Sequence, residues 1–574
     1  MNKLIKGSLL SVFALLVGCD STSDGNPDAA LSSPEASASE STASATAAQF
    51  SRFTYEGQSQ EQVEVGEGEF RNPIISGYAP DPTVARVGDD YYVVTSSFTH
   101  FPGLPIYHSK DLVNWTQIGN AIDRPDQFDY KGLEVSRGIF APDISFHEGT
   151  YYLASTCVDC GGNFVMTADS PTGPWSDPHW LGFEGIDPSI HWDDSGKAYI
   201  LNNGAPNEEP RYDGHRAIWI QEFDWQNLTM VGERKQLING GVDISTQPVW
   251  IEGPHIIQRN GYYYITAAEG GTSVHHSQTI FRSDDVWGPY TPAEHNPILT
   301  QRDLDFERDN PIIAAGHAKF VQIPNGDWWA TFLAIRSYDN DMFNIGRETF
   351  LLPVRWENDW PYILPRGERI PFALEKPELP EQPTPNPRQS GDFGYTDEFD
   401  GDQLALGWMG VRDPDSGLFY EVNNGTLSLN CQNGLGDLNS VPAFLGRRQQ
   451  HHIADLSTTV TFDPQADQDR AGLAAVQNDE NLIFLAITQD NGEDQVALYR
   501  RQGSTEDTLV NAAPLPSTEN VVLSMAFDAG QMSAHYEVNG ERHTLAEGVD
   551  ATNLSTNVAG GFVGTLIGPY CTRQ

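Results

Sequence analysis

The amino-acid sequence predicts an all-β protein, a five-bladed β-propeller followed by a β-sandwich. Three observations support this fold class. Five segments share one design, strand-like runs and turn residues recur at a spacing typical of propeller blades, and a second set of short alternating strands follows a proline-rich linker. A chain of 574 residues is also too long for one ordinary core, which agrees with two domains.

The N-terminal residues have the pattern of an export signal. Lys3 and Lys6 precede the apolar run LLSVFALLVG, which is too short to span a bilayer but has the length of the apolar region of a secretory signal. The run ends in LVGC, which looks like a bacterial lipobox with Cys19 as the lipidated residue; cleavage without lipidation is the alternative. We therefore expect residues 1–19 to form a lipoprotein signal peptide and the exported protein to be anchored in a membrane, facing the periplasm or the cell surface.

Composition separates the next segment from the rest of the chain. Residues 20–68 begin with a Ser-, Ala- and acid-rich stretch, which predicts a disordered tether. The whole chain carries 34 basic and 79 acidic side chains, and its net charge of -45 repels phosphate backbones. Nucleic acid is therefore not expected as a partner, and the membrane is expected to be contacted only through the lipid anchor.

The propeller is predicted over residues 69–372 from its repeats. Each repeat joins an acid, Pro or His motif to a polar turn and an aromatic or β-branched strand, and the turns Gly-Asp, Glu-Gly, Ser-Gly, Asn-Gly and Asn-Gly predict five hairpins. The repeats are APDPTVARVGDDYYVVTSS, APDISFHEGTYYLASTC, IDPSIHWDDSGKAYILNNG, EGPHIIQRNGYYYITAAEG and AGHAKFVQIPNGDWWATFLA. Motifs such as TADSPTGPWSDP lie between them, giving about four strands per unit. A pair of sandwiches would explain the strands but not the recurrent motif.

Three carboxylates stand where first strands begin. In a propeller the first strand of each blade runs beside the central axis, so Asp81, Asp187 and Glu252 are expected to converge at one mouth of the channel. This arrangement suits glycosidic cleavage, where a protonated acid donates to the leaving oxygen, a carboxylate activates water and a third carboxylate raises the pKa of the donor. A calcium cage is the structural alternative. It is disfavoured because the acids are not clustered in a local loop and Pro follows two of them directly.

These residues resemble the motifs of a known family. Glycoside hydrolase family 43, especially its two-domain β-xylosidases and α-L-arabinofuranosidases, has a similar set, and the resemblance covers most of the mature protein. It rests on PDP at 80–82, DPS at 187–189, EGPH at 252–255 and GRET at 346–349. The resemblance implies an inverting mechanism in which Asp81 is the general base, Asp187 modulates the pKa of the acid and orients it, and Glu252 is the general acid.

The same resemblance suggests further site residues. Arg347 matches an arginine that bonds sugar hydroxyls, the alternative being a surface ion pair with Glu348. His317 matches a histidine that in some members binds calcium; no cofactor is expected to be required, but calcium near His317 is possible, and a satisfied core histidine is the alternative. Phe101 and Phe140 are candidate pocket walls, although in related xylosidases a Trp often stands near the second.

The C-terminal part is predicted to be a separate domain. The prolines of residues 373–390 predict an extended linker, and the alternating strands of residues 391–574 predict a sandwich of two antiparallel sheets. This region resembles the concanavalin-like domain of the same xylosidases, in which a loop closes one side of the pocket; the motif GGFVG makes Phe562 the candidate. The chain ends at Gln574 without the further strand usual after this motif, so the last strand is expected to be missing or replaced. A free carbohydrate-binding module is the alternative.

Four cysteines remain after Cys19. The motif CVDC has no second such pair at zinc spacing, and export favours oxidation, so a Cys157–Cys160 disulfide is expected. Cys431 and Cys571 are the candidates for a second bridge, with two buried thiols as the alternative.

Together these features predict an exo-acting glycosidase of plant or algal pentose polymers. The expected reaction is release of xylose from the non-reducing ends of β-xylo-oligosaccharides, and the substrate would be a xylo-oligosaccharide or an arabinoxylan-derived glycan. The close alternative is α-L-arabinofuranosidase activity, because the two sugars present similar hydroxyl geometry. A catalytically silent glycan-binding lipoprotein is an alternative from another class, but binding alone would not require three carboxylates.

Overall fold

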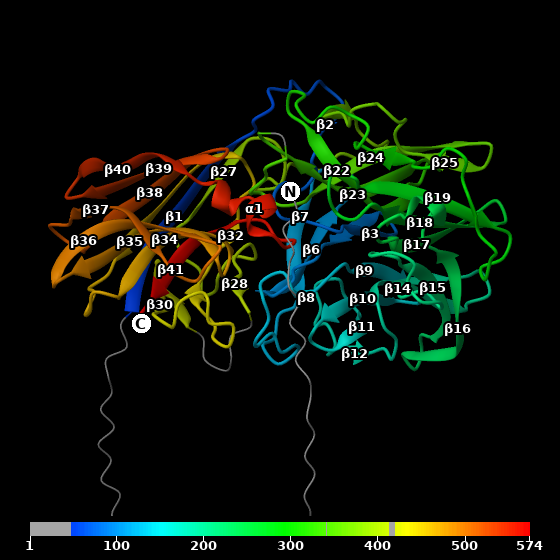
Figure 1. Ribbon diagram of the computed structural model, residues 1–574, viewed down its shortest axis with the longest axis horizontal. Helices are drawn as coiled ribbons and strands as arrows, with labels where there is room; N and C mark the ends of the chain where they lie inside the picture. The colour runs from blue at the N-terminus through cyan, green and yellow to red at the C-terminus, as the bar shows by residue number, and fades with distance from the viewer. Residues whose placement is uncertain (1–46, 340, 413–418, 574) are drawn as a thin grey trace, which may run out of the picture. The chain divides into compact units, whose positions relative to one another are not determined.

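A computed structural model describes residues 47–339, 341–412 and 419–573. Strands dominate these residues, and five units of four or five strands follow one another along the chain from blue β3 to green β25 in Figure 1. Among the described residues, no helix is long and apolar enough to cross a membrane. The lipobox with Cys19 and the first part of the proposed tether lie outside the described residues.

The five units are the blades of a propeller. One strand of each blade, β3, β9, β13, β17 and β22 in turn, contacts the next, and β22 contacts β3, so the ring is closed. The blades consist of β3 (Thr83–Val87), β4 (Asp90–Val94), β6 (Gly103–Ser109) and β7 (Thr116–Ile122); β8 (Gly138–Ile139), β9 (Asp143–His147), β10 (Thr150–Val158), β11 (Gly162–Ala168) and β12 (His179–Trp180); β13 (Ile186–Trp192), β14 (Ala198–Gly204), β15 (Ala217–Asp224) and β16 (Thr229–Asn239); β17 (Glu252–Arg259), β18 (Tyr262–Glu269), β19 (Ser277–Ser283), β20 (Thr291–Pro292) and β21 (Leu299–Thr300); and β22 (Ile312–Gln322), β23 (Trp328–Arg336), β24 (Glu348–Glu357) and β25 (Trp360–Tyr362).

All five predicted hairpins form, because their turns have the required residues. In the second and fourth blades both central turn residues have positive φ, with Glu148 at 47° and Gly149 at 87°, and Asn260 at 51° and Gly261 at 81°. Two-residue turns of this kind match the twist of the flanking strands. The prediction of a five-bladed propeller is confirmed.

A short segment joins the last blade to the first. The backbone N–H of Ile74 donates to the carbonyl of Thr349 in β24, and the N–H of Ala79 donates to the carbonyl of Arg347 at 2.9 Å. The hydroxyl of Thr349 donates back to the carbonyl of Ala79. The chain therefore enters the first blade already attached to the fifth, which places Asp81 beside Arg347.

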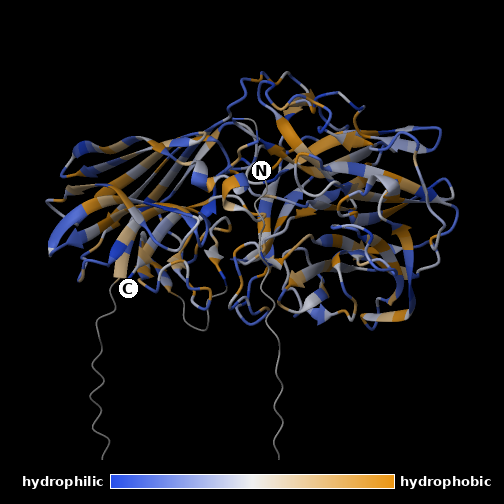
Figure 2. Cartoon of the chain, in the orientation of Figure 1, coloured by the Kyte–Doolittle hydropathy of each residue, from blue (hydrophilic) through white to orange (hydrophobic). Residues whose placement is uncertain are grey.

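The second domain is a sandwich of two sheets that pack around one apolar core. Figure 2 shows orange, hydrophobic segments along the strands and blue along many connecting loops. One sheet contains β29 (Tyr420–Asn423), β30 (Thr426–Asn430), β1 (Ala47–Gln58), β33 (Ile453–Thr461), β38 (Val521–Asp528), β39 (Gln531–Val538), β40 (Glu541–Asp550) and, paired with β1, β27 (Phe393–Asp397). The other contains β31 (Ala443–Phe444), β32 (Arg447–Arg448), β41 (Leu566–Thr572), β34 (Arg470–Asn478), β35 (Asn481–Asp490), β36 (Glu493–Gln502) and β37 (Thr508–Pro514). Short pieces complete the list: β2 (Glu69–Arg71) pairs with β26 (Ala373–Glu375), β5 (His100–Phe101) pairs with β28 (Gly410–Val411), and α1 is Thr556–Ala559.

The expectation of a disordered tether up to residue 68 was wrong for its last part. Residues 47–58 form β1, which is blue in Figure 1 and runs among the orange strands of the sandwich, paired with β30, β33 and β27. Phe50, Phe53 and Tyr55 are buried in the sandwich core, and this burial offsets the entropy of ordering the strand. A register shift between Phe50 and Arg52 interrupts the alternation of apolar residues, which hides the strand in the sequence.

The last strand is present, contrary to expectation. β41 follows the GGFVG motif and pairs with β34 along its whole length. The linker after the propeller is also more than a spacer, because Gln382 and Ser390 form hydrogen bonds with backbone groups of the propeller and of the segment that enters it.

Both expected disulfides form. Cys157 is bonded to Cys160 with a Cα–Cα distance of 5.1 Å, and Cys431 is bonded to Cys571 with a Cα–Cα distance of 4.8 Å. The second bridge joins the segment after β30 to β41, and so connects the two sheets of the sandwich.

Candidate active site

A cavity of about 500 Å³ lies at the end of the propeller where the first strands begin. This volume is in the range typical of small-ligand sites. Asp81 stands two residues before β3, Asp187 is the second residue of β13 and Glu252 is the first residue of β17, and all three line the cavity. The structure thus brings together three carboxyl groups from three blades.

Local backbone conformation turns these side chains toward the axis. Asp81 and Asp187 have left-handed φ angles of 54° and 57°, which cost energy for residues with a Cβ. Gly253, directly after Glu252, has φ 57°, and a Cβ there would lie 2.8 Å from the ring of His317. The pairing of β17 with β18 also shifts between Glu252 and His255. The Gly-Pro sequence after Glu252 therefore forms the bend that directs this carboxyl into the channel.

Asp81 is held in its ionised form. Nη1 and Nη2 of Arg347 donate to its two carboxylate oxygens at 2.7 and 3.4 Å, and the hydroxyl of Ser96 donates to Oδ2 at 2.6 Å. Burial opposes ionisation, but Arg347, aided by His317 and Ser96, lowers the pKa of Asp81 below its ordinary value. The carboxylate is therefore negatively charged and fixed in orientation.

The pKa values of Asp187 and Glu252 are raised, whereas that of Asp81 is lowered. Burial, together with repulsion from Asp81, raises the pKa of Asp187 to about 6. Burial, followed by the charges of Asp187 and Asp81, raises the pKa of Glu252 well above its ordinary value, although Arg347 and Arg216 oppose the shift. Asp187 accepts a hydrogen bond from the N–H of Gly253 at 3.0 Å, which ties it to the residue after Glu252. No described residue donates a hydrogen bond to the carboxyl of Glu252.

The cavity therefore contains one carboxyl group whose pKa is lowered, Asp81, and one whose pKa is raised, Glu252. Two carboxyl groups whose pKa values are displaced in opposite directions are the usual pair for general base and general acid. After burial, the charge of Asp187 is the largest contribution that raises the pKa of Glu252.

Three phenylalanines form an aromatic wall beside Arg347. The rings of Phe98 and Phe140 lie 5.1 Å apart, and the ring of Phe562, from the GGFVG loop of the sandwich, lies 5.9 Å from Phe98 and 5.8 Å from Phe140. The N–H of Phe562 donates to the hydroxyl of Ser136 at 2.9 Å, and Nη2 of Arg347 donates to the carbonyl of Phe562 at 3.3 Å. A loop of the second domain thus closes one side of the cavity.

The expectation for Phe101 was not met. Phe101 packs against the apolar core of the first two blades and lines a different cavity, beside Trp408, while Phe98 stands in the catalytic cavity. Phe98 has a left-handed φ of 51°. Two phenylalanines three residues apart in FTHF are alike in the sequence, so the pattern carries no signal for the choice.

Several cavity residues were not predicted. Arg216 lies over the ring of Trp250 at 4.1 Å, Thr272 accepts a hydrogen bond from Arg347, and the buried His276 has its pKa lowered to about 4 by burial. They come from loops or strand ends without a recurring motif, and only the closed ring of blades brings them to the cavity.

His317 lies in the wall of this cavity, on β22. It is 6% exposed, and its Nδ1 is 3.9 Å from Oδ1 of Asp81. Within residues 47–339, 341–412 and 419–573, no three or more His, Cys, Asp or Glu side chains are grouped so as to hold a metal ion.

Comparison with known proteins assigns the family. The model of glycosyl hydrolases family 43 matches residues 70–361, which is half of the chain and all of the propeller except its last residue, Tyr362. The chain belongs to glycosyl hydrolase family 43. The family 43 propeller is followed by a second match, over residues 396–574, to the β-xylosidase C-terminal concanavalin A-like domain, which agrees with the observed sandwich.

Relatives of this family 43 enzyme extend over both domains. It is 36% identical over 513 residues to a xylosidase/arabinosidase of Butyrivibrio fibrisolvens, covering 88% of this chain and 96% of the relative. It is 36% identical over 522 residues to a non-reducing end α-L-arabinofuranosidase of Bacteroides ovatus, covering 89% and 92%. A crystal structure of a GH43_12 from a capybara gut metagenome has a TM-score of 0.85 and 36% identity, covering 92% of this chain and all of that one. The protein is therefore a glycoside hydrolase.

Proposed function

We propose that this family 43 enzyme releases xylose from the non-reducing ends of β-xylo-oligosaccharides by an inverting mechanism. The observation that carries the proposal is the pairing of Asp81, whose pKa is lowered, with Glu252, whose pKa is raised, in a cavity that Phe562 closes on one side. A cavity closed on one side accepts the end of a chain and not its middle, which favours exo action.

The residues supply each proton transfer of the reaction. Glu252 donates its proton to the glycosidic oxygen as the bond to the leaving sugar breaks. Asp81 removes a proton from a water molecule, whose oxygen attacks the anomeric carbon from the opposite face. Arg347 holds the carboxylate of Asp81 through two hydrogen bonds, and its fork can also bond sugar hydroxyls. An attack from the opposite face converts a β-xyloside into α-xylose.

One set of assays tests the proposal. Purified enzyme is given aryl β-xyloside and aryl α-L-arabinofuranoside in parallel, and the first product from the xyloside is identified by NMR. The proposal expects faster hydrolysis of the xyloside, α-xylose as the first product, and stepwise release of xylose from short xylo-oligosaccharides. Initial β-xylose, or early release of mid-length products from xylan, would contradict it.

α-L-Arabinofuranosidase activity is the second candidate. It is favoured by the Bacteroides ovatus α-L-arabinofuranosidase, which is as similar to this chain as the xylosidase/arabinosidase is. Faster hydrolysis of the aryl arabinofuranoside in the same assay would support this candidate.

The residues around His317 do not form a calcium cage. Calcium prefers six to eight oxygen ligands, whereas the imidazole offers nitrogen and the oxygens of Asp81 are already bonded to Arg347 and Ser96. The proposed mechanism therefore uses only the side chains described above.

Neutralising Asp187 is expected to shift the pH profile. Glu252 donates only while protonated, so its raised pKa extends activity toward higher pH, and Asp187 is the largest charged contributor to that shift. Asp187→Asn should therefore move the high-pH limb of kcat/KM for xylobiose to lower pH. Asp193→Asn, on the same blade but outside the cavity, is the control and should leave the profile in place. A limb that stays or moves upward would contradict this role.

The lipid anchor is proposed from the sequence alone. If Cys19 is lipidated, the full-length protein should sediment with membranes of the producing bacterium, and Cys19→Ala should transfer it to the soluble fraction. Fractionation followed by immunoblotting measures this, with catalytic activity as the control for folding. Equal distribution of both forms would contradict the anchor.

A further inference from the structure

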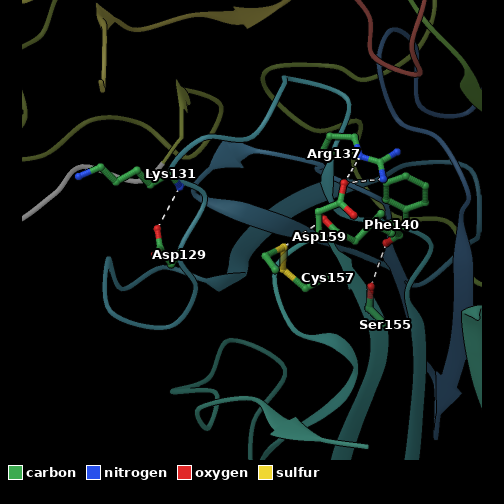
Figure 3. Close-up of a disulfide and its surroundings, with 9 residues drawn as sticks. Asp129, Lys131, Arg137, Phe140, Ser155, Cys157 and Asp159 are labelled. Atoms are coloured by element: carbon green, nitrogen blue, oxygen red, sulfur yellow. Dashed lines mark hydrogen bonds and ion pairs between the residues drawn. A yellow bond between two sulfur atoms is a disulfide. The ribbon is translucent and has the colours of Figure 1, made fainter. Parts of the chain in front are cut away.

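The hairpin turn between β10 and β11 lies at the edge of the catalytic cavity. Its sequence is CVDCGG, and the Cys157–Cys160 disulfide closes it (Figure 3). On the other side of the turn the ring of Trp180 packs where a Cβ on Gly161 would stand. Asp159, between the two cysteines, has a left-handed φ of 65°. The turn is therefore held from two sides in one conformation.

This turn fixes the position of an arginine at the cavity. In the pairing of β10 with β8, Val158 stands opposite Gly138, so Asp159 and Arg137 are the next residues across the two strands. Nε and Nη2 of Arg137 both approach Oδ2 of Asp159 at 2.6 Å, as Figure 3 shows. Arg137 and Val158 both line the cavity that contains Glu252.

The ion pair leaves part of the guanidinium available. Nη1 of Arg137 has no hydrogen-bond acceptor among the described residues, and 36% of the side chain is exposed. Ion pairs this exposed contribute little to stability. The main consequence of the pair is therefore to aim the remaining N–H groups of Arg137.

Arg137 lies nearer the opening of the cavity than Arg347 does. The Arg347 side chain is 7% exposed and bonded to Asp81, whereas Arg137 is five times more exposed. In an exo-acting enzyme the released sugar occupies the closed end, and the sugar that departs lies toward the opening. A planar guanidinium suits the adjacent hydroxyls of such a sugar.

We propose that Arg137 binds hydroxyl groups of the leaving-group sugar, and that Asp159, held by the disulfide-closed turn, is its positioning residue. The proposal deepens the proposed function and rests on it. It predicts that replacing Arg137 slows hydrolysis when the leaving group is a sugar but not when it is an aryl group, which lacks the sugar hydroxyls.

The test compares xylobiose with 4-nitrophenyl β-xyloside. Arg137→Ala should lower kcat/KM for xylobiose by about 10- to 100-fold, the value expected for hydrogen bonds to a charged group, and change that for the aryl substrate less than about twofold. Arg137→Lys should give an intermediate loss on xylobiose. The control is Arg124→Ala, in the same segment between β7 and β8, since Arg124 is 37% exposed and also pairs with an aspartate, Asp177, outside the cavity. It should affect neither substrate. Equal losses on both substrates, or none on xylobiose, would overturn the proposal.

The positioning role of the turn is tested separately, through KM for xylobiose. Asp159→Asn and Cys160→Ser should each raise KM for xylobiose about three- to tenfold at unchanged kcat, without changing KM for the aryl xyloside. The Cys160 substitution leaves the Cys431–Cys571 bridge intact, which a reducing agent would not. A KM that rises equally for both substrates would show a structural role only.

Failure of the proposed function is separable from failure of this inference. If the unmodified enzyme hydrolyses no xyloside, the proposed function is wrong. The loss of kcat/KM in Arg137→Ala is then measured with arabinobiose and with aryl arabinofuranoside. A larger loss on arabinobiose is still expected.

Discussion

Replacement of Asp81 by alanine is expected to abolish hydrolysis of both xylobiose and aryl β-xyloside. Asp81 is the carboxylate whose pKa is lowered, and Arg347 and Ser96 hold it in one orientation. Without it no group activates the attacking water, whatever the leaving group. The loss should reach about 10⁴-fold, the upper end for a general base, because Arg347 also loses its partner.

The control for this variant is Ser96→Ala. It removes one hydrogen bond to Asp81 but leaves both contacts from Arg347, so a loss of about tenfold or less is expected. Steady-state kinetics on both substrates, with circular dichroism to verify folding, measures the difference. Retention of more than a tenth of the aryl activity by Asp81→Ala would exclude Asp81 as the base.

Replacement of Glu252 by alanine should show a different dependence on the leaving group. Departure of a sugar alkoxide requires a proton, so hydrolysis of xylobiose should fall about 10²- to 10⁴-fold. An aryl group with a low-pKa phenol leaves without that proton, so hydrolysis of the aryl xyloside should fall much less. The ratio of the two losses identifies the proton donor.

Glu269 provides a matched control for Glu252. It is a buried glutamate of the same blade whose pKa burial also raises, but its carboxylate accepts from the N–H of Val242 and lies outside the cavity. Glu269→Ala should reduce both activities equally, if at all, through stability. Equal loss on both substrates by Glu252→Ala would refute its assignment as the general acid.

The propeller was predictable because its information is local and repeated. The five turns contain the residues that their φ angles require, and the number of repeats gives the number of blades. Convergence of the three carboxyl groups followed from the topology of such a ring. Features that depend on single bends and on loops could not be predicted. Examples are the position of Phe98 instead of Phe101 in the cavity wall and the position of Arg216 beside Glu252.

The two missed strands show a related limit. In β1 a bulge breaks the alternation between Phe50 and Arg52, and in β41 the sequence Gly568-Pro569 has the appearance of a turn. Both strands form because each has partners on both sides whose residues lie far away in the sequence. Tertiary pairing here outweighs a weak local signal.

The place of β1 in the sandwich makes this chain an example of one domain inserted within another. An early strand pairs with β33, about 400 positions later, and the whole propeller lies between them. A ribosome completes the propeller long before it supplies the partners of β1, so the sandwich is the last part to assemble. Pairing over such separations is slow because a long loop must close first. Cutting the gene at the proline-rich linker would therefore not yield two intact domains. The N-terminal piece would carry β1 without its partners, and the C-terminal piece would be a sandwich that lacks β1.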